Sequence, residues 1–206
     1  MSGEAFVVVG AGGHAKVVIS AIEAAGGRIA SILDDHPARW GMTVLGHPVT
    51  GPVARHAIPA DAAVILALGS NRDRANLSRR LRVRYGTVIH PSAVVHPTVS
   101  IGEGTVIFAG VVIQADTRVG PHTIVNTSAS IDHDGQIGSF THVAPGAHLA
   151  GSVTIGEGTL LGVGCSIIPG ITVGEWAVVG AGAVVIEPVP GGATAVGCPA
   201  RLLKRD

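Results

Sequence analysis

An aliphatic residue stands at every sixth position from residue 89 to residue 185 without a break. A glycine follows every third one, as in Ile101-Gly102 and Val119-Gly120, so the pattern has an 18-residue superperiod. This period predicts a β-solenoid with three six-residue sides per coil, one aliphatic side chain on each side pointing inward. A β-sandwich would not hold one phase over this length. The positions are Ile89, Val95, Ile101, Ile107, Ile113, Val119, Val125, Ile131, Ile137, Val143, Leu149, Ile155, Leu161, Ile167, Val173, Val179 and Val185.

The chain before this repeat has a different rhythm. Short apolar runs such as "AFVVVG" and "AAVILALGSN" alternate with segments of helical spacing such as "HAKVVISAIEAAGG". Such alternation predicts a small parallel α/β unit. We therefore expect two domains, a Rossmann-like α/β half domain over residues 1–86 and a solenoid with a C-terminal tail over residues 87–206.

The composition excludes several classes of function. Fourteen basic residues balance fourteen acidic ones, so no basic stripe is available for nucleic-acid phosphates. No apolar run approaches the roughly 18 to 20 residues of a membrane span, and the start has no basic segment typical of a signal peptide. Two cysteines form neither a disulfide framework nor a metal-binding spacing. We expect a cytoplasmic protein that binds neither nucleic acid nor membrane.

A glycine-rich loop follows the first predicted strand. "GAGGHA", from Gly10 to Ala15, matches G-x-G-x-x-G/A, whose glycines let the backbone approach a phosphate. Asp34 and Asp35 follow about twenty residues later, where an acid binds a ribose or base in dinucleotide enzymes. The loop alone suggests a dehydrogenase, or merely a tight turn in a βαβ unit. The short domain has room for one mononucleotide half, which favours a single nucleotide.

The sequence resembles the hexapeptide-repeat acyltransferases, and more narrowly the bacterial sugar acetyltransferases grouped with sialic acid O-acetyltransferase and bacillosamine N-acetyltransferase. The resemblance is in "VVVGAGGHAKVV", "LDD", "ALGSN", "IHPSAVV", "VNTSASIDHDGQIGSFTHVAPGAHLAG" and "GCPAR". It implies a left-handed parallel β-helix after the α/β domain, a homotrimer, and acetyl-CoA as co-substrate. It also implies a nucleotide-linked amino sugar as acceptor.

The resemblance also implies roles for single residues. His133 matches the general base, and Asp134 the acid that raises the basicity of the histidine. The positions that match substrate contacts are Gly12, Gly13, His14, Asp34, Asp35 and Gly69. The positions that match acetyl-CoA contacts are His142, Val163 and Ala181. Arg201, Lys204 and Arg205 would lie near a CoA phosphate unless the tail is merely solvated.

The repeat itself adds two expectations. Gly151 follows His133 by 18 residues, so it should stack on the same corner one coil away, where a glycine leaves room for a thioester. Its amide would approach the developing oxyanion, unless the glycine only turns the corner. His142 is half a coil from His133, so the two should meet only across a trimer interface.

Four alternatives stay open at this point. His133 and Asp134 could simply be solvated residues on a corner of a coil. Cys165 is at a small repeat position and would be a core residue. The enzyme could acetylate a sugar hydroxyl instead of an amine. A zinc β-helix that hydrates carbon dioxide would use His122, His133, His142 and His148, but these lack a close ligand pair. A non-catalytic trimeric scaffold would not need His133 beside Asp134.

We expect direct attack of the amine of a 4-amino deoxy sugar for surface glycans, with no metal and no acyl-enzyme.

Overall fold

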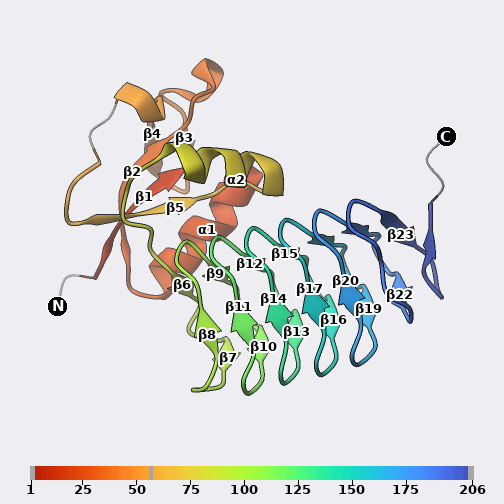
Figure 1. Ribbon diagram of the computed structural model, residues 1–206. Helices are drawn as coiled ribbons and strands as arrows, with labels where there is room; N and C mark the ends of the chain where they lie inside the picture. The colour runs from red at the N-terminus through yellow and green to blue at the C-terminus, as the bar shows by residue number, and fades with distance from the viewer. Residues whose placement is uncertain (1–2, 56–57, 204–206) are drawn as a thin grey trace.

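The computed structural model describes residues 3–55 and 58–203. Its N-terminal unit contains a five-stranded sheet of order β3-β4-β2-β1-β5, parallel except for β3 (Figure 1). Its elements are β1 (Ala5–Val9), α1 (Gly13–Ala24), β2 (Arg28–Leu33), β3 (Thr43–Val44), β4 (His47–Gly51), β5 (Ala62–Leu66) and α2 (Asn71–Arg80), with 3-10 helices at Pro37–Arg39 and Val53–Arg55.

The central strands of this sheet are covered on both faces. All residues of β1 and β5 are buried, as continuous apolar strands of parallel sheets are. Val18, Ile19 and Ile22 of α1 pack against one face, and Leu77 of α2 packs against the other. The α/β unit predicted from the alternating pattern is thereby confirmed.

The rest of the chain forms a three-sided parallel β-solenoid of two-residue strands, as the period of six predicts. From β6 to β22 each strand pairs with a strand 18 residues away, for example Ile113 with Ile131. At the C-terminal end β23 pairs with β21 at a different offset, and β24 pairs antiparallel with β23. Side 1 contains β6 (Val88–Ile89), β9 (Val106–Ile107), β12 (Ile124–Val125), β15 (His142–Val143), β18 (Leu160–Leu161), β21 (Val178–Val179), β23 (Thr194–Val196) and β24 (Arg201–Leu202). Side 2 contains β7 (Val94–Val95), β10 (Val112–Ile113), β13 (Ser130–Ile131), β16 (His148–Leu149), β19 (Ser166–Ile167) and β22 (Val184–Val185). Side 3 contains β8 (Ser100–Ile101), β11 (Arg118–Val119), β14 (Gln136–Ile137), β17 (Thr154–Ile155) and β20 (Thr172–Val173).

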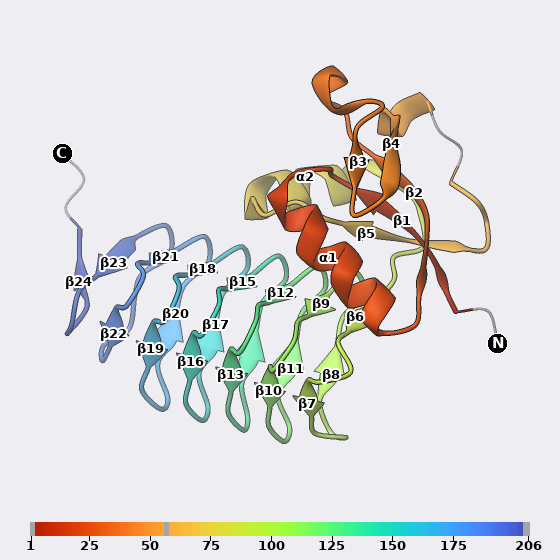
Figure 2. The same cartoon turned by 180° about the vertical axis from the view of Figure 1, so that it is seen from behind.

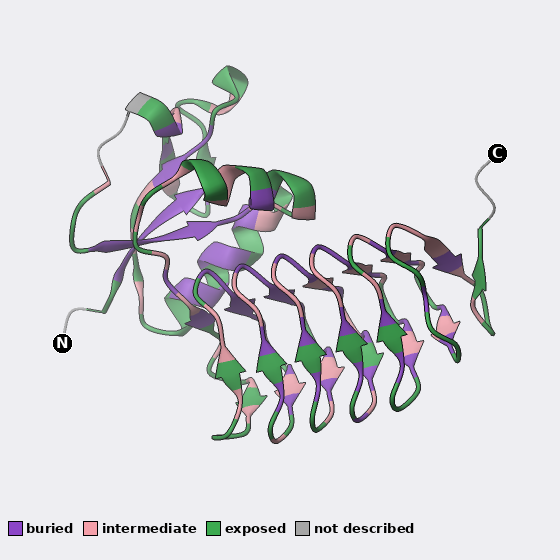
Figure 3. Ribbon diagram, in the orientation of Figure 1, coloured by how far each residue is buried: buried purple, intermediate pink, exposed green. Residues whose placement is uncertain are grey.

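The second residue of nearly every strand points into the solenoid and is buried, which gives the core its aliphatic column (Figure 3). The superperiod glycines have a separate cause. A Cβ on Gly138 would lie 2.6 Å from the backbone nitrogen of Glu157, and one on Gly156 would lie 2.4 Å from that of Glu175. Neighbouring coils therefore approach too closely at the corner after side 3 for any side chain there.

The N-terminal unit lies on side 1 of the solenoid. Val106, Phe108 and Ile124 share a buried cluster with α1, which lies beside β6, β9 and β12 (Figure 2). Buried Arg74 of α2 donates hydrogen bonds to the carbonyl oxygens of His122 and Phe140, each at 2.8 Å. The corners between sides 2 and 3 lie at the opposite edge of the molecule (Figure 1). A division into domains at residue 86 stays a prediction.

Candidate functional site

His133 and Asp134 lie together on the corner between sides 2 and 3, which we name the His133 corner (residues 132–135). The corner turns because Asp134 adopts a φ of 58°, in the left-handed region that Asp and Asn enter more easily than most residues. This turn places the Nδ1 of His133 2.7 Å from the Oδ2 of Asp134. A carboxylate accepts, so Nδ1 has the proton and Nε2 has a free lone pair.

The charges around His133 favour its protonated form. The hydrogen bond from Asp134 and the nearby charge of Asp132 raise the pKa of His133 above its ordinary value, and the ring is too exposed for burial to oppose them effectively. Asp132 also accepts a hydrogen bond from the backbone nitrogen of His133 at 2.8 Å. The imidazole is thus fixed in one tautomer and made more basic, as a proton acceptor requires.

Gly151 lies beside the ring of His133, as the 18-residue spacing predicts. A Cβ on Gly151 would stand 2.6 Å from both Cε1 and Nε2 of His133, which is too close for any real side chain. Its backbone N–H makes no hydrogen bond to the residues that the structure describes. The glycine therefore leaves room for the basic edge of the imidazole, and Gly151 itself is buried against the ring.

His142 has a different environment on side 1, under the N-terminal unit. The amide of Asn126 donates to its Nε2 at 3.1 Å. The Asn126 orientation is set because its Oδ1 accepts from the backbone nitrogen of Thr127 at 2.8 Å. Burial, with the charge of Arg74, lowers the pKa of His142 to about 4.

The other residues expected to contact acetyl-CoA lie on the corner between sides 1 and 2. Val163 is 56% exposed there, although it is aliphatic, and Ala181 follows it one coil later. Arg201 is exposed on β24. Lys204 and Arg205 lie outside the described residues. In one chain this corner and the His133 corner are separated by the width of side 2.

The glycine loop forms a cavity of about 280 Å³ with the end of β5 and the start of α2. Four of the predicted substrate residues line it, namely Gly12, Gly13, His14 and Gly69. Burial, with the charge of Arg74, lowers the pKa of His14 to about 4, so this ring is neutral near pH 7. The family resemblance thus implied four residues that the fold brings together.

Asp34 and Asp35 do not line this cavity. Asp34 is buried and accepts hydrogen bonds from the backbone nitrogens of Ala11 and His36, at 2.7 and 2.8 Å. Arg39 donates to it at 2.7 Å. Although burial raises the pKa of Asp34, these hydrogen bonds outweigh it and hold the pKa below its ordinary value. Asp35 is exposed and accepts from the backbone nitrogen of Val53 at 2.9 Å. Their contact with substrate stays a prediction.

Three polar residues of the site were missed from the sequence. Arg39 lines the cavity, Asn126 hydrogen-bonds His142, and Arg74 lowers the pKa of both His14 and His142. Arg39 had a local signal, since it follows the two aspartates on the next turn. Arg74 had none, because its hydrogen-bond partners on the solenoid, His122 and Phe140, are dozens of residues away in the chain.

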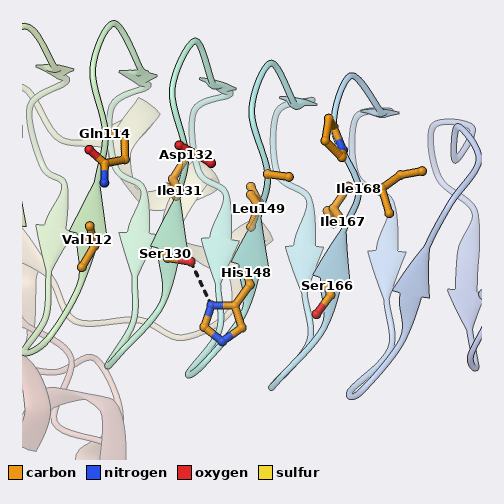
Figure 4. A pocket seen from close by; sticks show the side chains of 12 residues that line it. Val112, Gln114, Ser130, Ile131, Asp132, His148, Leu149, Ser166, Ile167 and Ile168 are labelled. Atoms are coloured by element: carbon orange, nitrogen blue, oxygen red, sulfur yellow. Dashed lines mark hydrogen bonds between the residues drawn. The ribbon is translucent and has the colours of Figure 1, made fainter.

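A larger cavity, of about 490 Å³, lies along side 2 from Val112 to Ile168 (Figure 4). Its polar groups are few, and the Oγ of Ser130 hydrogen-bonds the Nδ1 of His148 at 2.8 Å across neighbouring coils. Asp132, the neighbour of His133, lies at its edge. Side 2 therefore offers a partly apolar surface that runs up to the His133 corner.

The residues of the zinc alternative are dispersed. His122 is stacked on Phe140 at 5.1 Å, His133 and His142 lie on different edges, and His148 is on side 2. Within residues 3–55 and 58–203, no three His, Cys, Asp or Glu side chains gather closely enough to hold a metal ion.

Comparison with known proteins gives a consistent set of relatives. The PglD N-terminal domain matches residues 5–81, and the bacterial transferase hexapeptide (six repeats) matches residues 152–187. PerB from Caulobacter crescentus, solved in complex with CoA and GDP-perosamine, is 41% identical with a TM-score of 0.90, and the match covers 97% of each chain. The acetyltransferase domain of PglB from Neisseria gonorrhoeae FA1090, in complex with acetyl coenzyme A, is 36% identical with a TM-score of 0.90, over 98% of this chain and 100% of that one.

A curated protein is also similar. UDP-N-acetylbacillosamine N-acetyltransferase from Bacillus subtilis (strain 168) is 43% identical over 106 residues. The match spans about half of each protein, 47% of this chain and 47% of the relative.

Proposed function

Because the chain belongs to the PglD- and PerB-type hexapeptide-repeat acetyltransferases, we propose that it transfers the acetyl group of acetyl-CoA to the amine of a nucleotide-linked amino sugar. The acceptor is a 4-amino deoxy sugar, in line with the GDP-perosamine bound to PerB. Oxygen acetylation has less support, since one named relative is an N-acetyltransferase and another was solved with an amino-sugar nucleotide.

The observation that supports this function best is the His133–Asp134 pair beside Gly151. The amine nitrogen attacks the thioester carbonyl carbon while Nε2 of His133 takes the proton that the nitrogen loses. The intermediate then expels the CoA sulfur, which recovers a proton from His133. Asp134 holds Nδ1–H and stabilises the imidazolium between these steps. We assign the stabilisation of the oxyanion to the Gly151 amide, the role that the 18-residue spacing suggests.

Attack is direct. Cys165 is buried, and this burial raises the pKa of its thiol to about 11, so it is no nucleophile. The His133 corner, residues 132–135, contains no thiol. We therefore assign no acyl-enzyme to the reaction.

Each substrate has its own part of the chain. The nucleotide occupies the cavity of Gly12, Gly13, His14 and Gly69, with Asp34 and Asp35 nearby. Acetyl-CoA lies against His142, Val163 and Ala181, with Arg201 toward its phosphates. These elements are on different edges of one solenoid from His133, so the complete site forms between neighbouring subunits.

We further propose that the assembly is a homotrimer that packs through side 2. The outward positions of side 3 are polar and exposed, namely Ser100, Arg118, Gln136, Thr154 and Thr172. Those on or beside side 2 include Val94, Ile168 and Ile186, which are 65%, 40% and 39% exposed. A partly apolar face of this kind, which also carries Ser130, His148 and Ser166, suits burial against another copy. Light scattering should give three chains, and a fully active monomer would contradict the assignment.

The setting follows from the substrates. Acetyl-CoA and nucleotide sugars are cytoplasmic metabolites, so the enzyme works there and supplies an acetylated sugar for surface polysaccharide. Neither helix of the described residues is long and apolar enough to cross a bilayer.

A thiol-release assay tests the proposal. Acetyl-CoA is offered with GDP-perosamine, with UDP- and TDP-linked 4-amino sugars, and with sialic acid. We expect thiol release with one of the nucleotide amino sugars and a product that survives alkaline hydroxylamine, as an amide does. A labile ester product, or release only with sialic acid, would favour O-acetylation. No release with any acceptor would contradict the function.

A further inference from the structure

The cavity above the glycine loop has one positive side chain among the described residues that line it. That residue is Arg39, from the 3-10 helix after β2. His14 is neutral near pH 7, because burial first and the Arg74 charge second lower its pKa to about 4. Asp73 adds a carboxylate on the α2 side. A dianionic ligand in this cavity therefore has Arg39 as its available counter-charge.

The carboxylate of Asp34 already accepts three hydrogen bonds from the protein. Its Oδ2 accepts from Ala11 and from Arg39, and its Oδ1 accepts from His36. Its side chain is 7% exposed, whereas that of Arg39 is 42% exposed. A ligand could reach the oxygens of Asp34 only by displacing the arginine or the loop backbone. The carboxylate thus acts as a support, and the group it presents to the cavity is the guanidinium.

The guanidinium lies along the loop itself. Its Nη1 and Nη2 are 3.7 and 3.8 Å from the position that a Cβ on Gly12 would occupy. Within the described residues its hydrogen bond is the one from Nη1 to Asp34, so the Nη2 and Nε donors are available. The first backbone N–H groups of α1 lack intrahelical partners, as at any helix start. Arginine donors and these amides converge on one small volume.

We propose that Arg39 binds the diphosphate of the sugar nucleotide and so sets the preference for nucleoside diphosphates, while Asp34 acts through Arg39 as a positioning residue. The inference rests on the proposed function, since it assigns a residue within the same site. Arginine suits this task because its planar, permanently charged fork matches phosphate oxygens.

Calorimetric binding without acetyl-CoA tests the inference. Wild type, Arg39→Met and Arg39→Gln are titrated with GDP, GMP and guanosine, and with UDP, UMP and uridine. The matched control is Arg28→Met, which removes an exposed arginine of the same unit whose partner Asp61 is 3.6 Å away and also exposed. A melting curve of each variant shows that it is folded.

The expected result is a selective loss. Both Arg39 variants should bind the preferred nucleoside diphosphate roughly 10- to 100-fold more weakly, the usual effect of a lost charge-assisted hydrogen bond. Nucleoside affinity should change little, so the ratio of diphosphate to nucleoside affinity falls by the same factor. Arg28→Met should match wild type.

Two outcomes would overturn the inference, and they are distinguishable. If wild type binds diphosphates and the Arg39 variants lose affinity for diphosphate, monophosphate and nucleoside by one common factor, or lose none, Arg39 is only structural or has no role. That result leaves the acetyltransferase proposal standing. If wild type binds no nucleoside diphosphate at all, the proposed function fails together with the inference.

Discussion

His133 and His142 stand nine positions apart in one coil, yet the fold gives their imidazoles opposite chemistry. His133 lies on an exposed corner beside two aspartates, and its pKa is raised, first by the hydrogen bond to Asp134. His142 lies under the N-terminal unit, where burial first and the Arg74 charge second lower its pKa to about 4. In a solenoid, the layers packed outside each side therefore decide what a residue does, more than the repeat does.

The two histidines should fail in different ways when they are replaced. His133→Asn removes the proton acceptor, so turnover should fall by roughly 10²- to 10⁴-fold, the usual contribution of a positioned base. The Michaelis constant for acetyl-CoA should change little. Steady-state kinetics check both, with sizing and circular dichroism as controls for fold. Near-normal turnover of a folded His133→Asn enzyme would show that His133 is not the proton acceptor.

Gly151 sharpens the account of the His133 corner. In Gly151→Ala the new Cβ would have to occupy space 2.6 Å from the imidazole, so the ring of His133 must move. A displaced base should lower turnover roughly 10- to 100-fold, as a misplacement of about 1 Å does. Gly164→Ala is not a suitable control, because its φ of 66° strains any side chain. In Gly13→Ala the new Cβ has no atom within 4 Å, and the backbone φ is not in the left-handed region. This variant instead shows how a change in the glycine loop alters the Michaelis constant for the sugar nucleotide.

His142 should act on binding rather than on proton transfer. His142→Asn breaks the hydrogen bond to Asn126, which supports the wall that we assign to acetyl-CoA. We expect the Michaelis constant for acetyl-CoA to rise about tenfold, equivalent to one ordinary hydrogen bond, while turnover falls less. A loss of turnover as large as that of His133→Asn would show that the two residues share one task.

The pH dependence of the free energy of unfolding should show a smaller effect of the buried histidines. His14, His122 and His142 have folded pKa values of about 4, against 6.5 for an ordinary histidine. Between these values the unfolded chain binds more protons, so the free energy of unfolding should fall as the pH falls from 6.5 to 4. Each pKa unit amounts to about 1.4 kcal/mol per histidine. Urea unfolding at fixed protein concentration should show a shallower fall for His142→Asn, whereas an unchanged slope would contradict its burial as a neutral ring.

The sequence predicts the parts of the molecule that repeat. The period of six placed Ile113 and Ile131 on one side, and the 18-residue spacing placed Gly151 against His133. His133 and Asp134 are neighbours in the chain, so their contact could be predicted from the sequence.

The parts that sequence reasoning missed depend on distant contacts. Nothing local shows that the guanidinium of Arg74 of α2 is buried and donates hydrogen bonds to carbonyl oxygens on the solenoid corners. These contacts join the two units, and a spacing rule describes only one of them. Asp34 shows the same limit, because its spacing after the glycine loop predicts a ligand contact but does not show that its carboxylate is buried and hydrogen-bonded to Arg39.

The most direct test is the pH dependence of kcat/KM for the sugar nucleotide in wild type, Asp134→Asn and His142→Asn. The part of each pH profile that reflects ionisation of the substrate amine is the same for all three enzymes. We predict that wild type has an enzyme group with a pKa above the ordinary histidine value, that Asp134→Asn moves this pKa downward, and that His142→Asn leaves it in place. A limb that stays fixed in Asp134→Asn and shifts or disappears in His142→Asn would contradict the assignment of His133 as the base.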